Sequence, residues 1–348
     1  MAERPAISVE GLWQVFGANA DSALAKATAE GGPTAEIAGR LLDRGLIPAV
    51  RDATFDVADG ELFVIMGLSG SGKSTLIRGI SRLVEPTAGK VDIEGEDVLA
   101  ASKKRMTELR RTRMGMVFQH FGLFPHMTVL DNVAFPLKVG GMGRKARYEK
   151  VRAIIEMVGL KGREDAFPRE LSGGQRQRVG IARSLAGDCS VWFLDEPFSA
   201  LDPLIRRQLQ DEFLEIRQRL NTTIVFITHD IAEALKLADR IAIMRDGVIV
   251  QIGTPTEIVL NPVDDYVREF SKDVAKGRHA RVASVMHAAG TGAVGPDDPG
   301  LRTDMTLEAA LASCMSLYEP VPVRDGNGQL VGMVRPQDLA AALQVDET

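Results

Sequence analysis

A glycine-rich segment at residues 67–75 places the strongest constraint on what this chain can fold into. Its sequence, GLSGSGKST, fits the pattern G-x-x-x-x-G-K-[ST], directly after an apolar run at Glu61–Met66 and before a helical run at Thr75–Arg82. Glycines let consecutive backbone N–H groups turn inward toward phosphate oxygens, and a helix that begins at about Gly72 adds its positive end. The segment therefore predicts a strand–loop–helix unit that binds the phosphates of a nucleotide.

The side chains of this loop have separate candidate roles. Lys73 can reach the β- and γ-phosphates, Ser74 can supply an oxygen to Mg²⁺, and Thr75 is a further hydroxyl at the phosphate end. The alternative is a glycine-rich turn that only caps a helix. The predicted nucleotide-binding residues of the loop are Gly67, Leu68, Ser69, Gly70, Ser71, Gly72, Lys73, Ser74 and Thr75.

Apolar runs alternate with helical patterns along the rest of the chain. Strands are expected at Val191–Leu194, Thr223–Ile227 and Arg240–Met244, with helices between them. This repetition is typical of an α/β fold whose parallel sheet is covered by helices on both faces. A mainly helical pattern predicts a helical subdomain at about 103–175.

Two further features set the expected domain organisation. A helical insertion at about 18–48 follows a strand at Ile7–Phe16, and its two short helices are divided by Gly31–Pro33. After about Ala275 a basic stretch and then a Gly/Pro/Asp-rich stretch indicate a linker. The expected parts are a large nucleotide-binding domain at 1–275, a linker at 276–300 and a small α+β module at 301–348, or from near 282.

Two carboxylates end one of the apolar strands. In the sequence VWFLDEP at Val191–Pro197, Asp195 is placed to hold Mg²⁺ through its water shell, and Glu196 can polarise the water that attacks the γ-phosphate. Two solvated loop acids before a proline are the alternative. His229 follows the strand Thr223–Ile227, where it can hydrogen-bond the γ-phosphate or the water, although a lone histidine is more often structural.

The sequence LSGGQ at Leu171–Gln175 resembles the signature motif of ABC ATPases. The motifs also follow one another in the order of that family, over residues 1 to about 250. That order is the phosphate loop, Gln119, the signature, Asp195 with Glu196, the segment SALD that ends at Asp202, and His229. The resemblance implies a P-loop NTPase fold of the ABC type, a helical subdomain, ATP hydrolysis, and ATP with Mg²⁺ as cofactors.

The resemblance also implies roles for single residues. In the family two ATPase subunits face each other head to tail, and the signature of each closes on the ATP that the other holds. The signature residues here would be Leu171, Ser172, Gly173, Gly174 and Gln175. Catalysis would involve Glu196, His229 and Gln119, and the metal would be held by Ser74, Gln119 and Asp195.

Three other positions take roles from the same resemblance. Asp202 would couple the two ATP sites, as the D-loop aspartate does in the family. Phe16 would stack on adenine, with Trp13 as the alternative ring and core packing as an alternative for either. The stretch Phe118–Asn132 would lie beside a groove that receives a helix of the membrane subunit, or would form a hinge between subdomains.

Two features resemble the ATPases of the glycine betaine, proline and choline importers. One is the insertion at about 18–48, and the other is the amino-acid sequence of residues 64–75 and 125–132. This resemblance implies an ATPase that powers uptake of a small osmoprotectant (glycine betaine, proline betaine, choline or proline) through integral membrane permease subunits. A periplasmic or extracellular solute-binding protein would act indirectly. The alternatives are an importer ATPase for a polyamine or an amino acid, and a soluble ABC ATPase in DNA repair or translation.

Composition limits the partners and the location of the chain. A net charge of −5 argues against general affinity for nucleic acid. The two cysteines are far apart and predict neither a disulfide framework nor a metal site, as suits a reducing cytosol. Apolar runs of about 18 residues are absent from the sequence, so we expect no segment that spans a bilayer. Together with this, the resemblance to importer ATPases implies a peripheral protein on the cytoplasmic face of the cell's inner membrane.

The C-terminal residues resemble one CBS repeat. A helix is expected from Met305, two strands that place Val321, Val323, Val331 and Met333 on one face, and a closing helix at 338–343. Such repeats normally work in pairs, and one copy is evident here. The hypothesis is a module that regulates transport by sensing ionic strength or a nucleotide; the alternative is an appendage that stabilises a dimer.

Overall fold

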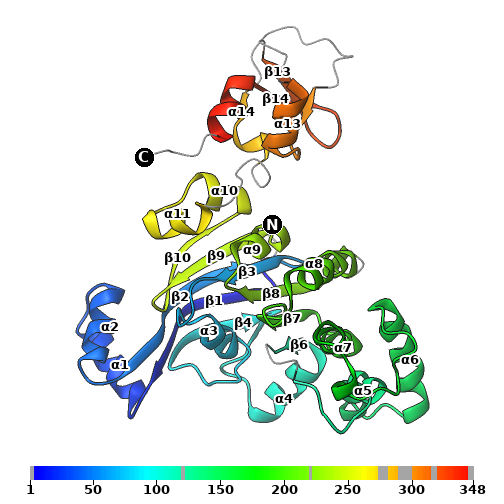
Figure 1. The fold of residues 1–348 in the computed structure, drawn as a ribbon. Helices are drawn as coiled ribbons and strands as arrows, with labels where there is room; N and C mark the ends of the chain where they lie inside the picture. The colour runs from blue at the N-terminus through cyan, green and yellow to red at the C-terminus, as the bar shows by residue number, and fades with distance from the viewer. Residues whose placement is uncertain are drawn as a thin grey trace. The chain divides into compact units, whose positions relative to one another are not determined.

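The computed structural model describes residues 4–118, 122–218, 222–272, 281–288, 300–314 and 320–343 (Figure 1). The chain divides into two compact units. The larger unit contains Met1–Glu233 and Ala242–Val250, and the smaller unit contains Ala234–Ile241 and Gln251–Thr348.

A six-stranded sheet forms the centre of the larger unit, with the strand order β10-β9-β3-β8-β7-β6. Neighbouring strands from β3 to β6 pair in parallel, and every residue of β3, β7 and β8 is buried. Continuous apolar runs are typical of parallel strands covered on both faces. The strands are β3 (Leu62–Met66), β6 (Met114–Val117), β7 (Val191–Asp195), β8 (Thr223–Thr228), β9 (Arg240–Arg245) and β10 (Val248–Gly253).

A second, antiparallel sheet has the order β2-β1-β4-β5. Its strands are β1 (Ile7–Phe16), β2 (Ile47–Val57), β4 (Ala88–Ile93) and β5 (Glu96–Asp97). The expected strand at Ile7–Phe16 is confirmed, whereas this sheet as a whole is not evident in the sequence pattern. Its longest strand, β2, mixes buried and exposed residues because one face of an antiparallel sheet can meet solvent.

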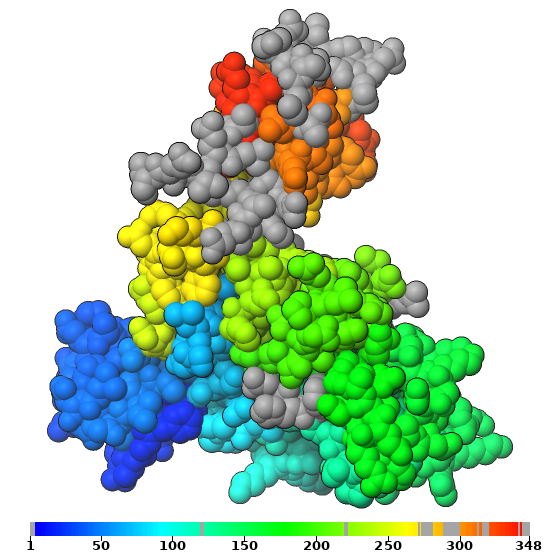
Figure 2. All heavy atoms as spheres, in the orientation of Figure 1, coloured from blue at the N-terminus to red at the C-terminus, as the bar shows by residue number. Residues whose placement is uncertain are grey.

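The predicted helical insertion is confirmed as α1 (Ala20–Ala29) and α2 (Thr34–Leu42). Its two helices share a core with the end of β1, in which Ala27 and Leu41 are fully buried. Pro33 fixes an extended backbone directly before α2, so the chain must leave its helical path between the two helices. In Figure 2 these helices (blue) form a lobe at one end of the larger unit.

In the described residues of the stretch at 103–175, helices predominate and one strand is present. The stretch contains α4 (Lys103–Thr112), α5 (Val129–Val139), α6 (Arg144–Met157) and a short 3₁₀ turn at Pro168–Glu170. The strand is β6, which the sequence pattern did not predict and which pairs with β7 in the central sheet. A four-residue apolar run is too short for its period to separate strand from helix. Figure 1 shows α5, α6 and α7 gathered together at one side (green).

Four more helices complete the larger unit and its boundary. The helical run predicted after the phosphate loop and the helices expected between the later strands are confirmed as α3, α8 and α9, and the signature residues begin a further helix, α7. They are α3 (Lys73–Ile80), α7 (Gly173–Ala186), α8 (Pro203–Gln218) and α9 (Ile231–Leu237).

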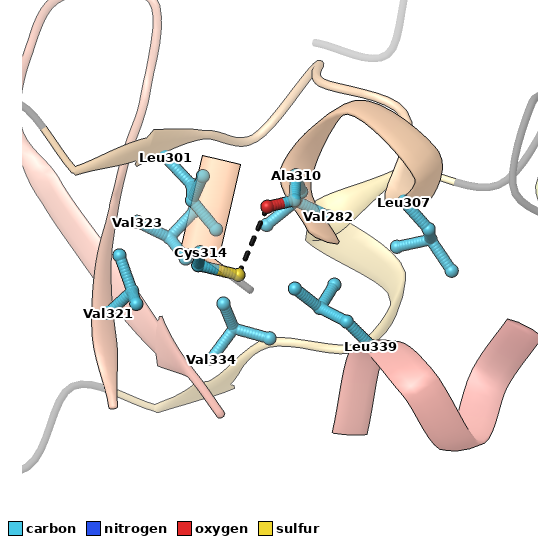
Figure 3. Packing of buried hydrophobic residues seen from close by; sticks show 9 residues of the cluster. All are labelled: Val282, Leu301, Leu307, Ala310, Cys314, Val321, Val323, Val334 and Leu339. Carbon is cyan, nitrogen blue, oxygen red and sulfur yellow. Dashed lines mark hydrogen bonds between the residues drawn. The ribbon is translucent and has the colours of Figure 1, made fainter. Parts of the chain in front are cut away.

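The smaller unit ends in a compact α+β module with the strand order β11-β14-β13-β12. Its core, shown in Figure 3, packs Val321 and Val323 against Leu307 and Leu339. The elements of this unit are α10 (Pro255–Leu260), α11 (Asp265–Ser271), a 3₁₀ turn at Val282–Ser284, β11 (His287–Ala288), β12 (Leu301–Arg302), α13 (Leu307–Cys314), β13 (Val321–Arg324), β14 (Leu330–Val334) and α14 (Pro336–Leu343).

The expected core face of this module is correct on β13 and wrong by one residue on β14. Val321 pairs with Val334 and Val323 pairs with Gly332, so Gly332 and Val334 share the buried face. Met333 instead lies opposite Pro322, and Val331 packs only at the edge of the core. Because side chains alternate along a strand, a shift of one residue reverses the predicted face.

Candidate nucleotide-binding site

The glycines of the phosphate loop are required by the backbone that surrounds them. The loop joins β3 to α3, and Gly67 and Gly72 have φ angles of 155° and 102°, in a region that favours glycine. A Cβ atom on Gly67 would lie 2.2 Å from the carbonyl oxygen of Met244, and one on Gly72 would lie 2.3 Å from that of Ala49. The loop is therefore pressed between β9 and β2.

An open cleft of about 520 Å³ lies over the start of α3. The structure brings the predicted carboxylate Glu196 and the predicted His229 to this cleft together with most of the loop. Gly67 and Ser71 are buried and do not line the cleft. The lining residues are Ala49, Leu68, Ser69, Gly70, Gly72, Lys73, Ser74, Thr75, Glu196 and His229.

Lys73 is a buried positive charge at the base of this cleft. Its ammonium group donates hydrogen bonds to the carbonyl oxygens of Gly67 at 2.8 Å and Leu68 at 2.9 Å. Burial lowers the pKa of Lys73 from its ordinary value, and the nearby carboxylates Glu196 and Asp195 oppose that shift. A phosphate group that entered the cleft would meet this charge with the N–H groups at the start of α3.

Asp195 and Ser74 form an oxygen-rich corner beside the lysine. The hydroxyl of Ser74 donates to Oδ1 of Asp195 at 2.8 Å, and Asp195 is 1% exposed at the end of β7. The guanidinium of Arg78 lies 3.5 Å from the other carboxylate oxygen. A hydroxyl and a carboxylate are ligands suited to Mg²⁺, so the corner fits the expected metal. Gln119, the third predicted ligand, lies outside the described residues.

Glu196 follows Asp195 with an unusual backbone conformation. Its φ angle is 45°, in the left-handed region that is rare outside glycine, and such a conformation costs about 1–3 kcal/mol. The turn directs Glu196 into the cleft while Asp195 stays with Ser74. There, Oε2 of Glu196 lies 3.1 Å from Nδ1 of His229. The carboxylate and the imidazole predicted from separate strands are thus in contact.

The two candidate rings for adenine differ in exposure. Trp13 is 7% exposed and packs in the core that β1 shares with the insertion, whereas Phe16 is 42% exposed at the end of β1. Of these two rings, the structure makes Phe16 the accessible one.

The signature residues are not among the described residues that line the cleft. Ser172 is exposed and caps α7: its hydroxyl accepts from the N–H of Gln175 at 3.3 Å, and the Gln175 side chain accepts from the N–H of Ser172 at 2.9 Å. Leu171 and Gly174 are buried, and a Cβ on Gly174 would lie 2.8 Å from Ile205 of α8. Gly173 is half-buried between them.

Asp202 likewise acts at a helix start. Its carboxylate accepts from the backbone N–H of Ile205 at 3.1 Å, in the first turn of α8, and the residue is exposed. A side-chain oxygen at such a position satisfies one of the free N–H groups of the helix. This local role is compatible with the coupling role that the family resemblance implies.

A second, more apolar groove of about 340 Å³ lies beside β6 and α5. It includes Phe118, Phe124 and Phe135, and the last two rings are 4.5 Å apart. Cys189 also lines it, and burial raises the pKa of this thiol to about 11. The predicted stretch at 118–132 supplies only part of this groove. No local sequence pattern indicates Cys189 in this groove or Ala49 in the nucleotide cleft, because contacts between distant segments bring each residue there.

Comparison with known proteins supports these motifs. The ABC transporter family model matches residues 50–199. The chain is 48% identical to the trimethylamine N-oxide transport system ATP-binding protein TmoW of Pelagibacter ubique, over 96% of each protein. It is 43% identical to the glycine betaine transport ATP-binding protein OpuAA of Bacillus subtilis, over 98% of this chain and 78% of that protein.

A solved structure shows the same likeness in three dimensions. The dimeric structure of MJ0796, a bacterial ABC transporter cassette, superposes with a TM-score of 0.59 at 29% identity. It covers 72% of this chain, and 98% of the cassette is matched.

Proposed function

Because the chain belongs to the ABC transporter family of ATP-binding subunits, we propose that its ATP hydrolysis drives import of a small methylated amine, such as trimethylamine N-oxide or glycine betaine. The observation that carries this proposal is the single cleft that joins the phosphate loop to the Glu196–His229 pair. The predicted importer of an osmoprotectant agrees with the names of the relatives. Those names favour it over a polyamine or amino-acid importer and over a DNA-repair ATPase.

The residues of the cleft divide the reaction between binding and proton transfer. Lys73 and the loop N–H groups hold the β- and γ-phosphates. Their interaction with the phosphates becomes more favourable as negative charge develops in the transition state. Glu196 accepts the proton of the attacking water, and His229 orients the Glu196 carboxylate from 3.1 Å. Ser74 and Asp195, with Gln119, would hold Mg²⁺, which supplies positive charge against the phosphates.

The functional unit in this proposal is a head-to-tail dimer. Ser172 and Gly173 present an exposed helix start, and the described residues of the cleft do not include them. A second copy that brings its own Ser172 over the first copy's ATP would complete both sites. Asp202 would then couple the two ATP sites of the dimer. The solved structures of the similar cassette MJ0796 are dimeric, which supports this arrangement.

The proposed membrane partner is a permease that docks on the apolar groove beside β6 and α5. An amphipathic helix fits such a groove, because aromatic side chains line it and the groove is open. Within the described part of the chain, no helix has both the length and the apolarity needed to cross a bilayer. From the transport systems named for its relatives, we propose that the chain is a peripheral subunit on the cytoplasmic face of the inner membrane, with a solute-binding protein acting on the other side.

The C-terminal module has a proposed regulatory role. We retain the predicted boundaries of 1–275, 276–300 and 301–348 for the ATPase domain, the linker and the single CBS-like module. Deletion of residues 276–348 should reduce the dependence of transport on ionic strength while leaving the nucleotide cleft intact. Unchanged salt dependence in the deletion variant would remove the sensing role.

The solute is tested by reconstitution. The chain would be combined in vesicles with its own permease and binding protein, and uptake of labelled trimethylamine N-oxide, glycine betaine, choline and spermidine would be compared. We expect ATP-dependent uptake of at least one methylated amine and no uptake of spermidine. Uptake that is confined to spermidine would contradict the proposed substrate class, and uptake that proceeds equally with Glu196→Gln would contradict the proposed role of ATP hydrolysis.

A further inference from the structure

One arginine of α8 connects two loops that are distant in the sequence. Nη1 of Arg206 donates to Oδ2 of Asp230 at 3.3 Å. Its Nη2 donates to two backbone carbonyl oxygens, that of Ser199 at 3.4 Å and that of Leu201 at 3.1 Å. A planar guanidinium can make such contacts at the same time because its N–H groups point in fixed, separate directions.

The first loop is the one that follows Glu196. The N–H group and the hydroxyl of Ser199 donate to the carbonyl oxygen of Glu196, at 3.3 and 3.0 Å. The N–H of Glu196 itself donates to the carbonyl oxygen of Ile227 in β8 at 3.1 Å. Arg206 therefore holds a short loop whose other end fixes the backbone of Glu196.

The second loop is the one that carries His229. Asp230 follows His229 directly, and its N–H donates to the hydroxyl of Thr228 at 3.0 Å. Its Oδ1 accepts from the N–H groups of Ala232 at 2.9 Å and Glu233 at 3.2 Å, at the start of α9. One oxygen of Asp230 thus caps a helix while the other binds Arg206, and the backbone beside His229 is fixed from both sides.

A second polar contact keeps α8 beside the start of α9. Nε2 of Gln210 donates to Oε1 of Glu233 at 2.9 Å, and each of these two residues is 5% exposed. Gln210 lies four residues after Arg206, so both side chains lie on one face of α8. The ion pair between Arg206 and Asp230 is therefore held against a docked helix, unlike a pair between two freely moving surface side chains.

Helix stability does not account for a positive charge at position 206. Arg206 is the fourth residue of α8, which begins at Pro203, and a positive side chain so near a helix start meets the positive end of the helix dipole. The contacts of the guanidinium are instead with Asp230 and with loop carbonyl oxygens. Its placement favours a role in joining the two loops.

We propose that Arg206 is a positioning residue for ATP hydrolysis: it holds the loop after Glu196 to Asp230 and thereby fixes the contact between Glu196 and His229. This inference rests on the proposed function of that pair. Arg206 is not among the described residues that line the cleft, so it acts through the geometry of the pair. A misplacement of reacting groups by about 1 Å can cost about 10²-fold in rate.

The test measures ATP hydrolysis and nucleotide binding by the full-length chain. Arg206→Met keeps an unbranched side chain of similar length and removes all its N–H donors. We expect kcat to fall about 10-fold to 100-fold, because the carboxylate and the imidazole lose their fixed contact. The Kd for a non-hydrolysable ATP analogue should stay within about twofold, because Lys73 and the phosphate loop bind the phosphates.

Asp230→Asn breaks the same ion pair from the other side. Asparagine accepts hydrogen bonds at a helix start as well as aspartate does, so the cap of α9 should persist. We expect kcat to fall about tenfold. Glu212→Gln is the matched control, since Glu212 of α8 pairs with Arg178 at 2.7 Å, with side chains 19% and 32% exposed against 25% and 32% for Arg206 and Asp230. It should change kcat by less than about twofold.

A double variant distinguishes positioning from general stabilisation of the fold. In the His229→Ala background the contact that Arg206 is proposed to fix no longer exists. Arg206→Met should then lower kcat by less than about a further twofold, as measured by single-turnover hydrolysis. A role in overall stability would lower kcat by the same factor in both backgrounds.

Three results would overturn the role of Arg206: an unchanged kcat in Arg206→Met and Asp230→Asn, a Kd that rises in step with the loss of kcat, or an equal loss of kcat with and without His229. If Arg206→Met does not fold, Asp230→Asn decides by the same criteria. His229→Ala tests the underlying pair, and a wild-type kcat in that variant would reject the proposed function of His229 itself.

Discussion

Two helices that begin at motifs predicted to bind nucleotide, α3 and α7, start in different surroundings. α3 begins at Lys73 behind Gly72, inside a cleft that also holds Glu196 and His229. α7 begins at Gly173 behind Ser172, which is exposed and caps its own helix. Both helix starts can attract an anion.

The two helix starts differ in what packs around them. β2 and β9 close on the phosphate loop from two sides, and β7 and β8 bring the carboxylate and the imidazole. Among the described residues, the signature start makes its own capping contacts and packs against Leu201 and α8. In our proposal a second copy supplies what is missing, so changes at the two helix starts should have different consequences.

The largest expected effect is that of Glu196→Gln on turnover. The amide keeps the size of the carboxylate but does not accept the proton of the attacking water, so kcat should fall about 10²–10⁴-fold. Binding of ATP by the phosphate loop should persist, and dimers should accumulate with ATP, as measured by size-exclusion chromatography with light scattering. Turnover at the normal rate in this variant would contradict the role of Glu196.

Lys73→Ala should act on binding at the complete helix start. Hydrogen bonds between charged groups contribute about 1.5–3 kcal/mol, so the Kd for ATP should rise about 10-fold to 150-fold. Titration with a fluorescent nucleotide measures this directly in the single subunit. An unchanged Kd would mean that the cleft does not hold phosphate. It would contradict the proposal that the start of α3 binds the nucleotide.

Ser172→Ala should spare binding and impair hydrolysis. The Kd for ATP of the single subunit should stay within about twofold, because Ser172 is outside the cleft, while kcat should fall about tenfold through the loss of a charge-assisted hydrogen bond in the dimer. Ser102→Ala is the matched control, since Ser102 caps α4 in the same way by accepting from Arg105. It should lose a similar free energy of unfolding, about 1 kcal/mol, with kcat unchanged.

If Ser172→Ala and Ser102→Ala reduce hydrolysis equally, the effect of Ser172 is one of helix stability alone. Full hydrolysis in Ser172→Ala would contradict the shared site more directly. Dimers that mix wild-type and Ser172→Ala subunits sharpen the comparison further, because the defect should appear at the ATP held by the wild-type subunit.

The sequence alone predicts only some of the strands and residues that form the nucleotide cleft. Strands such as β3 and β7 are continuous apolar runs between punctuating residues, so their positions and the motifs at their ends could be predicted. β6 could not, because four residues carry too little pattern. Ala49 reaches the cleft from β2 through pairing between distant segments, which no local pattern contains.

Which side chains are exposed, and which face of a strand they occupy, was harder still to predict. Trp13 and Phe16 lie three residues apart with similar chemistry, and only the packing of the insertion decides that Trp13 is buried. In the C-terminal module Met333 is as apolar as its neighbours, and the register with β13 decides that Val334 faces the core. Each of these outcomes depends on contacts between segments that are distant in sequence.

The smallest expected effect concerns why the signature has glycine at position 174. A Cβ there would lie 2.8 Å from Cγ2 of Ile205, so Gly174→Ala should lower the free energy of unfolding by about 1–3 kcal/mol through overpacking. Ile205→Ala removes that methyl group, and the double variant should recover part of the loss.

Gly39→Ala is the control. Gly39 lies within α2 with nothing within 4 Å of an added Cβ, so Gly39→Ala should raise the free energy of unfolding by about 0.5–1 kcal/mol. Urea denaturation measures all four variants. If Gly174→Ala proves as stable as wild type but fails to hydrolyse ATP, the glycine serves the partner's nucleotide and not the packing of α7 on α8.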